Sequence, residues 1–424
     1  MDNDAPNKPV PTLKERSTRY LVFLVIFLTI NEIYDTYTTQ YPSIIVDLVE
    51  GEFGLNSSQY AFFLGIITIG TYFAFISQYL ADRIGRKIML FVTLFGMGFA
   101  SMWVGLGTNV VQYAIASFFL YIFFSSDIWT MYMVEESPKD HRGKMVNLVL
   151  VGGCIGALLV PGLFDALVVG AGYSWRSMTW FAMLAMGFAF ITLATKETRV
   201  YDALKQKRRQ EEKKEERRAF IHVIQDFKQP FLRETRLKTI ILITFGFVIG
   251  MNYMFILMGK DFLVNVKHLS QDAASDVILF MGIAAIVGYL INGFLLDKIG
   301  RKKTLILFIA LFPASIIIAV LGDLVAIYIS VSLISASFWN LGICSRIYCQ
   351  ELYPTAMRGQ ITGWRSLFYA MGSTAGALIG SIVLQYVDLG VLFIINSFIF
   401  LPFIPIIWKL LPETRSKQLL ETTV

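Results

Sequence analysis

Residues 135–144 read "EESPKDHRGK", a charged stretch between two long apolar runs, and residues 351–360 read "ELYPTAMRGQ". Four residues of the first stretch recur in the second, each 216 residues later: Glu135, Pro138, Arg142 and Gly143 return as Glu351, Pro354, Arg358 and Gly359. Two more motifs repeat in the same order, "DRIGRK" (82–87) as "DKIGRK" (297–302) and "KETR" (196–199) within "PETR" (412–415). Three motifs at nearly one offset predict two homologous halves that run in parallel.

The apolar runs around these motifs are long enough to cross a membrane. The chain is 55% hydrophobic and 16% charged, with a mean hydropathy of +0.60, whereas soluble domains carry about 25% charged residues. Runs of about 20 apolar residues span the hydrocarbon layer as helices, which satisfy their own backbone groups there. We therefore expect an all-α integral membrane protein without a cleavable signal peptide. Membrane topology explains the net charge of +6 better than nucleic-acid binding does.

The spacing of the apolar runs predicts twelve transmembrane helices in two pseudo-symmetric six-helix bundles. They are expected near 20–45, 58–81, 88–107, 110–134, 144–168, 175–195, 237–259, 273–296, 303–321, 324–350, 360–387 and 389–411. The expected organisation is a tail (1–19), a first bundle (20–195), a charged linker (196–236), a second bundle (237–411) and a short tail (412–424). We interpret the linker as a helix along the inner membrane surface, with a lipid-headgroup docking platform as the alternative.

The distribution of basic residues predicts the orientation. With the N-terminus inside, the cytoplasmic segments hold 33 of the 37 lysines and arginines, the outside connections hold Arg176, Lys260 and Lys267, and Arg346 lies within a span. Cytoplasmic loops are enriched in such residues. Both termini are therefore expected in the cytoplasm, with the chain in the cell membrane.

The paired motifs resemble those of the major facilitator superfamily over about residues 19–415. "YLADRIGRK" and "FLLDKIGRK" are similar to its loop motif between helices 2–3 and 8–9, and "EESPKDHRG" and "ELYPTAMRG" to the motif that ends helices 4 and 10. Together with "PETR", they point to the sugar-transporter-like branch, which also holds organic-ion, phosphate and aromatic-acid carriers. Gln78 departs from the pattern, where glycine is usual.

The resemblance implies a gate formed by the motif residues. They would hold the two halves closed on the inside and separate when the carrier opens inward. The alternative is that these charges only mark topology and anchor loops. Asp82 and Asp297 are expected to cap neighbouring helices. The candidate gating residues are Asp82, Arg83, Gly85, Arg86, Glu135, Arg142, Gly143, Asp297, Gly300, Arg301, Glu351, Arg358 and Gly359.

Acidic residues inside predicted spans are candidates for proton binding, because charge is costly there. Glu32, Asp35, Thr36 and Thr39 share one face of the first helix, and the two acids lie about 18 and 22 Å along it. Two carboxylates in a low dielectric favour protonation of one of them. The alternative is that one acid pairs with a buried base or approaches the outer water. Asp127 in the fourth helix is a second candidate.

Arg346 is the candidate for anion recognition, since guanidinium binds carboxylate or phosphate bidentately. The alternative places it in the network of Glu351 and Glu135. The tryptophan and the Gly-Pro-rich stretch of sugar porters are absent here, which disfavours a sugar. Candidate cavity-lining residues are Thr39, Trp129, Tyr132, Asn252, Tyr253, Trp339 and Tyr348.

Together these features predict a secondary active transporter, not an enzyme, that imports a small polar solute with protons by rocking-bundle alternating access. An organic anion is favoured over a sugar. The alternatives are a sugar or other facilitator or exporter without proton coupling, and a non-transporting nutrient sensor on the same fold. No Gly-x-x-x-x-Gly-Lys-Ser/Thr loop occurs. The expected partners are a small-molecule substrate, protons and the lipid bilayer, with no nucleic acid, cofactor or metal, and the chain is expected to be a monomer.

Overall fold

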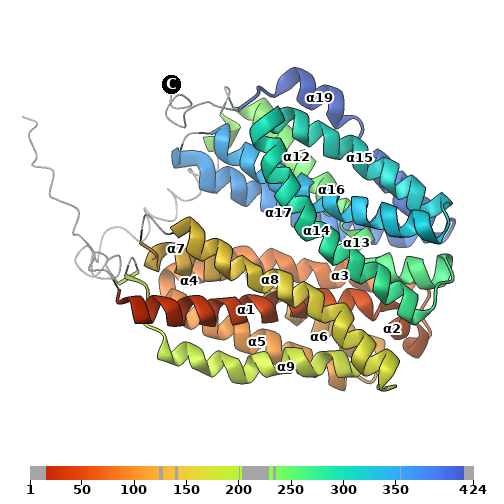
Figure 1. Ribbon diagram of the computed structural model, residues 1–424, viewed down its shortest axis with the longest axis horizontal. Helices are drawn as coiled ribbons and strands as arrows, with labels where there is room; N and C mark the ends of the chain where they lie inside the picture. The colour runs from red at the N-terminus through yellow and green to blue at the C-terminus, as the bar shows by residue number, and fades with distance from the viewer. Residues whose placement is uncertain are drawn as a thin grey trace, which may run out of the picture.

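The computed structural model describes residues 16–123, 128–138, 142–199, 201–202, 229–232, 235–353 and 355–414. Within these ranges the regular structure is helical throughout, and the helices form two bundles that lie against each other (Figure 1). The predicted all-α architecture of two bundles is confirmed.

The first bundle starts at α1 and ends at η4. Its elements are α1(Thr18–Ile44), α2(Val46–Phe53), α3(Ser57–Thr68), η1(Ile69–Tyr72), α4(Phe73–Ile84), α5(Arg86–Leu106), α6(Val110–Phe123), α7(Ile128–Glu136), α8(Arg142–Phe164), η2(Asp165–Gly170), η3(Trp175–Ser177), α9(Met178–Phe188) and η4(Ala189–Ala194).

The second bundle follows the linker. Its elements are η5(Gln229–Phe231), α12(Arg236–Asn252), α13(Met254–Asp261), η6(Phe262–Val266), α14(Gln271–Ile299), α15(Arg301–Leu321), α16(Leu324–Glu351), α17(Thr355–Val383), α18(Leu389–Phe398) and α19(Phe403–Leu410).

Ten helical stretches of the described chain are long and apolar enough to cross a membrane. The two further predicted spans are interrupted helices. A short 3₁₀ segment, η1, divides the second span into α3 and α4, and the fourth span consists of α6 and α7 on either side of the undescribed residues 124–127. With these two, the twelve-helix arrangement predicted from the apolar runs is complete.

Glycines bring one helix pair close together in each bundle. A Cβ at Gly156 of α8 would lie 2.6 Å from the carbonyl oxygen of Ile33 on α1. Gly372, which lies 216 residues later on α17, abuts the carbonyl of Phe247 on α12 in the same way. Small residues at such positions allow the helix backbones to approach. The sequence repeat is therefore also a repeat of packing.

The two ends of the molecule differ in how the halves meet. The end that holds the three repeated motifs, together with the start of α1 and the end of α19, is the motif end (left in Figure 1), and the opposite end is the far end. The halves pack through α3 on α17, α8 on α14, and α1 and α2 on α13. Toward the far end, Ser58 donates to the carbonyl of Ser381 at 2.7 Å, and deeper inside Thr68 and Thr374 are hydrogen-bonded at 3.1 Å. This conformation is sealed at the far end.

Candidate functional site

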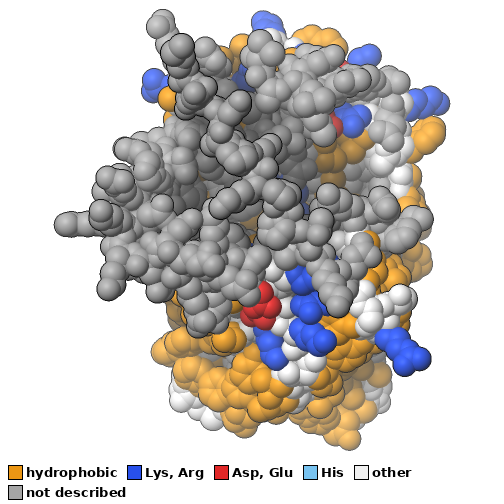
Figure 2. All heavy atoms as spheres, turned by 90° about the vertical axis from the view of Figure 1, so that its left-hand side faces the viewer, with side chains coloured by type: hydrophobic (Ala, Val, Ile, Leu, Met, Phe, Trp, Pro, Cys, Tyr) orange, Lys and Arg blue, Asp and Glu red, His pale blue; other side chains and the backbone are white. Residues whose placement is uncertain are grey.

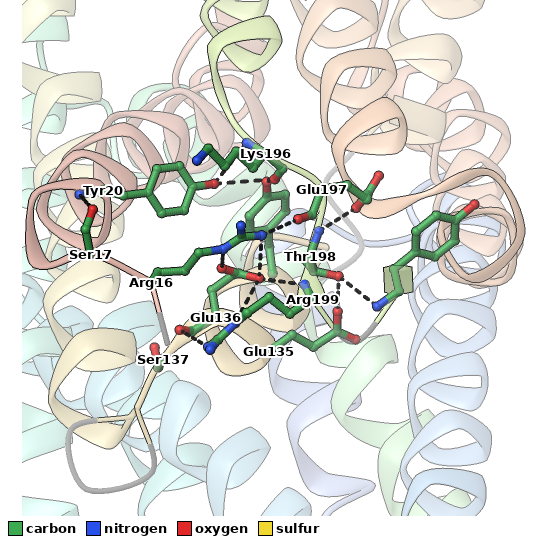
Figure 3. A network of polar contacts seen from close by, with 12 residues as sticks. Arg16, Ser17, Tyr20, Glu135, Glu136, Ser137, Lys196, Glu197, Thr198 and Arg199 are labelled. Atoms are coloured by element: carbon green, nitrogen blue, oxygen red, sulfur yellow. Dashed lines mark hydrogen bonds and ion pairs between the residues drawn. The ribbon is translucent and has the colours of Figure 1, made fainter. Parts of the chain in front are cut away.

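The first half builds a charged network at the motif end from residues far apart in the sequence (Figure 3). Arg86, the first residue of α5, donates from Nη2 and Nε to Glu135 Oε1 of α7 at 2.9 and 3.3 Å. Its Nη1 donates to the carbonyl of Ala81 at 3.2 Å. The hydroxyl of Thr198 donates to the other oxygen of Glu135. The side chain of Arg86 is only 5% exposed, so this ion pair is shielded from water, and it ties α5, α7 and the chain after η4 together.

A carboxylate from the third motif caps α5. Glu197 accepts from the backbone N–H groups of Arg86 and Lys87 at 3.1 and 3.2 Å. A negative charge is favourable there because the first N–H groups of a helix have no partner within it. Gly85 precedes them with φ +121°, and a side chain at this position would collide with the Glu197 carboxylate. Gly85 is therefore required both for its backbone conformation and for the space it leaves.

The second half repeats this arrangement. Arg301 pairs with Glu351 at 3.0 Å, and Glu413 accepts from the N–H groups of Arg301 and Lys302 at 2.9 and 3.1 Å. Gly300 has φ +94°, and Thr414 donates to Glu351 as Thr198 does to Glu135. Each network closes within its own half.

One part of the network belongs to the first half alone. The side chain of Glu136 is 0% exposed and accepts from Arg16 Nε and from the backbone N–H of Arg199, both at 2.7 Å. Arg16 also donates to the carbonyl of Glu197 at 2.8 Å. The residue 216 positions after Glu136 is Leu352, so the repeat is broken here. The segment before α1 is thereby attached to the motif network.

The predicted gating residues are only partly described. The side chains of Asp82, Arg142, Asp297 and Arg358 lie outside the described part, as does Asp127 entirely. Gly143 lies in the first turn of α8, and Gly359 lies within α17. The carbonyl of Arg83 accepts from Tyr201. The capping role expected of Asp82 and Asp297 is carried by Glu197 and Glu413. Their motif was recognised as a repeat, but no role was assigned to it.

The acids of α1 lie inside the first half. Glu32 and Asp35 are 8% and 6% exposed. A Cβ at Gly153 of α8 would lie 3.1 Å from Glu32 Oε1, so this carboxylate faces α8. Cys154, the next residue of α8, lies within electrostatic reach of Glu32 and of Tyr289 on α14 of the other half. Glu32 therefore lies close to the interface between the halves.

Arg346 on α16 approaches that interface from the second half. Its guanidinium is exposed and lies within electrostatic reach of Tyr289 and Tyr369. Because Glu351 is bound by Arg301 and Thr414, Arg346 takes a place of its own instead of their network.

A second arginine accompanies it. Arg365 of α17 is 4% exposed, donates to Ser345 at 3.2 Å and lies within electrostatic reach of Tyr369. Arg346 was expected to be the only base inside a span. That expectation is wrong, because Arg365 falls within the apolar span Gln360–Val383. The run "GWRSLF" (363–368) inside the predicted eleventh helix carried the signal.

The candidate cavity-lining residues divide into two groups. Tyr253 and Trp339 are half-buried and contact each other, with ring centroids 6.4 Å apart, and Thr39 is also half-buried. The others are buried in this structure and do not line a cavity. Trp129 packs in the core of the first half, and Asn252 donates to the carbonyls of Val248 and Asn396. The hydroxyls of Tyr132 and Tyr348 donate to the carbonyls of Lys196 and Pro412 within the motif networks.

Comparison with known proteins agrees with this arrangement. The model of the Major Facilitator Superfamily matches residues 25–373 and 241–423. The chain is 24% identical over 343 residues to the sialic acid transporter NanX of Escherichia coli (strain K12), covering 75% of this chain and 76% of NanX. It is 23% identical over 397 residues to the arabinose-proton symporter of Bacillus subtilis (strain 168), covering 84% and 83%.

Among solved structures, the fold is similar to that of the xylose transporter XylE from E. coli in its inward open conformation. The TM-score is 0.73 at 17% sequence identity, and the alignment covers 95% of this chain and 99% of XylE.

Proposed function

Because the chain belongs to the major facilitator superfamily and is a multi-pass membrane transporter, not an enzyme, we propose that it carries a small organic anion together with protons. The observation that carries this proposal is the placement of ionisable groups on the two sides of the interface. Two arginines, Arg346 and Arg365, lie on the second half, and the buried acids Glu32 and Asp35 lie on the first. Substrate sites of such carriers lie between the two halves near the middle of the membrane.

The motif end faces the cytoplasm in this proposal. Lysine and arginine side chains of the described residues gather on that face and apolar side chains cover its flanks (Figure 2). The positive-inside rule places such a face in the cytoplasm, and both termini with it. The structure, sealed at the far end, is then the inward-facing state, and the chain works as a single copy.

Alternating access follows from the two rigid networks. Each motif network closes within its half, so each bundle moves as one body. The close glycine contacts between α1 and α8 and between α12 and α17 lie within single halves, so they hold each bundle together as it moves. In the opposite, outward-facing state the charges of the two motif networks would meet and close the motif end.

The anion proposal rests on chemistry. A guanidinium offers paired donors to a carboxylate or phosphate. Arg346 is exposed toward the aromatic side chains of Tyr289 and Tyr369, which would contact an apolar part of the solute. The names of the relatives include both an acid, sialic acid, and sugars, arabinose and xylose. A sugar is therefore the second candidate substrate.

Proton coupling is assigned to the α1 acids. Protonation of Glu32 or Asp35 would offset the negative charge of a bound anion, so that the solute and a proton cross together. This also explains why two carboxylates lie in a span that otherwise reads as apolar.

A binding measurement on the purified carrier tests the proposed substrate class. Thermal unfolding is followed with sialic acid, monocarboxylates, aromatic acids, phosphate, arabinose or xylose present, at pH 5.5 and pH 7.5. A ligand at 100 times its Kd stabilises by about 2.7 kcal/mol. We expect stabilisation by an acid, stronger at pH 5.5 and lost in Arg346→Ala but kept in Arg176→Ala, which alters an arginine outside the interface. Stabilisation by a sugar alone, unchanged in Arg346→Ala, would overturn the anion proposal.

A further inference from the structure

A buried charged cluster joins the two halves at the far end, where α2 of the first half meets α13 of the second. Asp47 and Glu50 lie on α2, and Lys260 and Asp261 lie on α13. Their exposed fractions are 9%, 4%, 1% and 0%. Lys260 was expected in an outer connection from the count of basic residues, but it lies inside this interface.

Lys260 makes the cationic contact of the cluster. Its Nζ lies 3.6 Å from Asp47 Oδ1 and 3.3 Å from the ring centroid of Phe164. Gln271 at the start of α14 donates to the second oxygen of Asp47. The charge of Asp47 is therefore satisfied from the opposite half.

Glu50 is in a different position. Its Oε1 is buried and receives no hydrogen bond from the described residues. Its carboxyl lies within hydrogen-bond reach of the carboxyl of Asp261, which already accepts from Ser57 at 2.8 Å and from Asn265 at 2.5 Å. Two carboxyl groups in such contact need one proton between them, because a carboxylate can only accept.

The surroundings of Glu50 favour its protonated form. Burial, Asp261 and Asp47 raise the pKa of Glu50 to about 9. The other ionisable groups around the cluster are Tyr60 of α3, which faces Glu50, and Lys260 and Asp165, which lie on the side of Asp47. The acids outnumber the single lysine, so the cluster attracts a further positive charge.

We propose that Glu50 and Asp261 form a proton-binding site that seals the far end and that reads the pH on that side of the membrane. This inference rests on the proposed carrier function. When α2 meets α13, the site binds one proton, and an O–H···O bond forms between the two carboxyls. When the halves separate, that bond breaks, water reaches Glu50, and the proton leaves to the same side from which it came.

This proton therefore does not cross the membrane, unlike the one assigned to Glu32 or Asp35. Its effect is on the equilibrium between the sealed and open far end. Since closing takes up one proton, the sealed-to-open ratio falls about tenfold for each unit of pH between the ordinary and the raised value of Glu50. Acid on the far side favours the sealed, inward-facing state.

The experiment measures the separation of the halves at the far end. Spin labels are attached to cysteines that replace Tyr173 and Tyr386, which are 52% and 82% exposed and belong to different halves. Cys154, Cys344 and Cys349 are replaced by alanine. Pulsed electron–electron double resonance of the full chain in lipid nanodiscs at pH 5, 6.5 and 8 then gives the populations of short and long distances.

We expect the long-distance population of the otherwise native chain to grow with pH, with an open-to-sealed ratio that rises about tenfold per unit. Glu50→Gln, which is neutral at every pH, should stay sealed and lose the pH dependence. Glu52→Gln is the matched control, because Glu52 lies on the same helix but pairs with Arg176 of its own half at 2.6 Å. It should keep the pH dependence of the unmodified chain.

A distance distribution that does not change between pH 5 and pH 8 would overturn the proposal, as would a pH dependence that persists in Glu50→Gln. The two proposals fail separately. Proton-coupled uptake in a chain whose far end ignores pH removes only the Glu50–Asp261 site. A pH-dependent far end in a chain that moves no solute removes only the transport proposal.

Discussion

Replacement of Gly300 by alanine tests how the motif networks are built. The backbone of Gly300 has φ +94° and ψ 163°, and a Cβ there would lie 2.6 Å from Glu413 Oε2. This backbone region is essentially restricted to glycine, and a side chain in it costs about 1–3 kcal/mol. The added methyl would also displace Glu413 from the N–H groups of Arg301 and Lys302, and loss of a helix cap costs about 0.5–2 kcal/mol.

The expected loss for Gly300→Ala is therefore about 2–4 kcal/mol in the free energy of unfolding. The assay is reversible unfolding in mixed detergent micelles, followed by far-UV circular dichroism. Gly363→Ala is the control, because nothing lies within 4 Å of a Cβ at this position inside α17. Alanine is favoured over glycine in helices by about 1 kcal/mol, so the control should be neutral or slightly stabilising. If Gly300→Ala is as stable as Gly363→Ala, the account of the cap is wrong.

Three further predictions concern other contacts. Glu136→Ala should lower the free energy of unfolding by about 3 kcal/mol, since it leaves the partly buried Arg16 and Arg199 without their carboxylate, and the same unfolding assay measures it. The hydrogen bond from Arg176 lowers the pKa of Glu52, so its stabilising effect is present above the ordinary pKa of the carboxyl and is lost as the pH falls through the lowered pKa. A pH titration of the thermal midpoint from 6 to 3 should accordingly fall less steeply in Glu52→Gln, and equal slopes would contradict this. Arg86→Ala and Glu135→Gln should couple by about 1–2 kcal/mol in a double-mutant cycle, because the pair is shielded from water, and additive losses would count against the pair.

The sequence was sufficient to predict the twelve spans and the two halves, because apolar runs of membrane length and a repeat of three motifs are local properties of the chain. The interruptions were less accessible. The 3₁₀ segment η1 lies where Gly70 abuts the carbonyl of Phe118 on α6, a contact that depends on tertiary packing.

The candidate site was only partly predictable for the same reason. Glu197 caps a helix that begins 111 residues earlier, and the repeat of "KETR" showed that the motif matters without showing what it contacts. Glu50, Lys260 and Asp261 look like ordinary residues of outer connections. They become a buried cluster only because two halves that are remote in sequence meet at the far end.

Solute accumulation in proteoliposomes tests the proposed transport most directly. The acid that stabilises the purified carrier is supplied in radiolabelled form outside, with the outer pH one to two units below the inner pH. We predict that the acid accumulates inside above its outer concentration, that a protonophore abolishes this, and that Asp35→Asn retains exchange of labelled for unlabelled solute but loses accumulation. Uptake that only equilibrates, or that is indifferent to the pH gradient and the protonophore, would contradict proton-coupled transport.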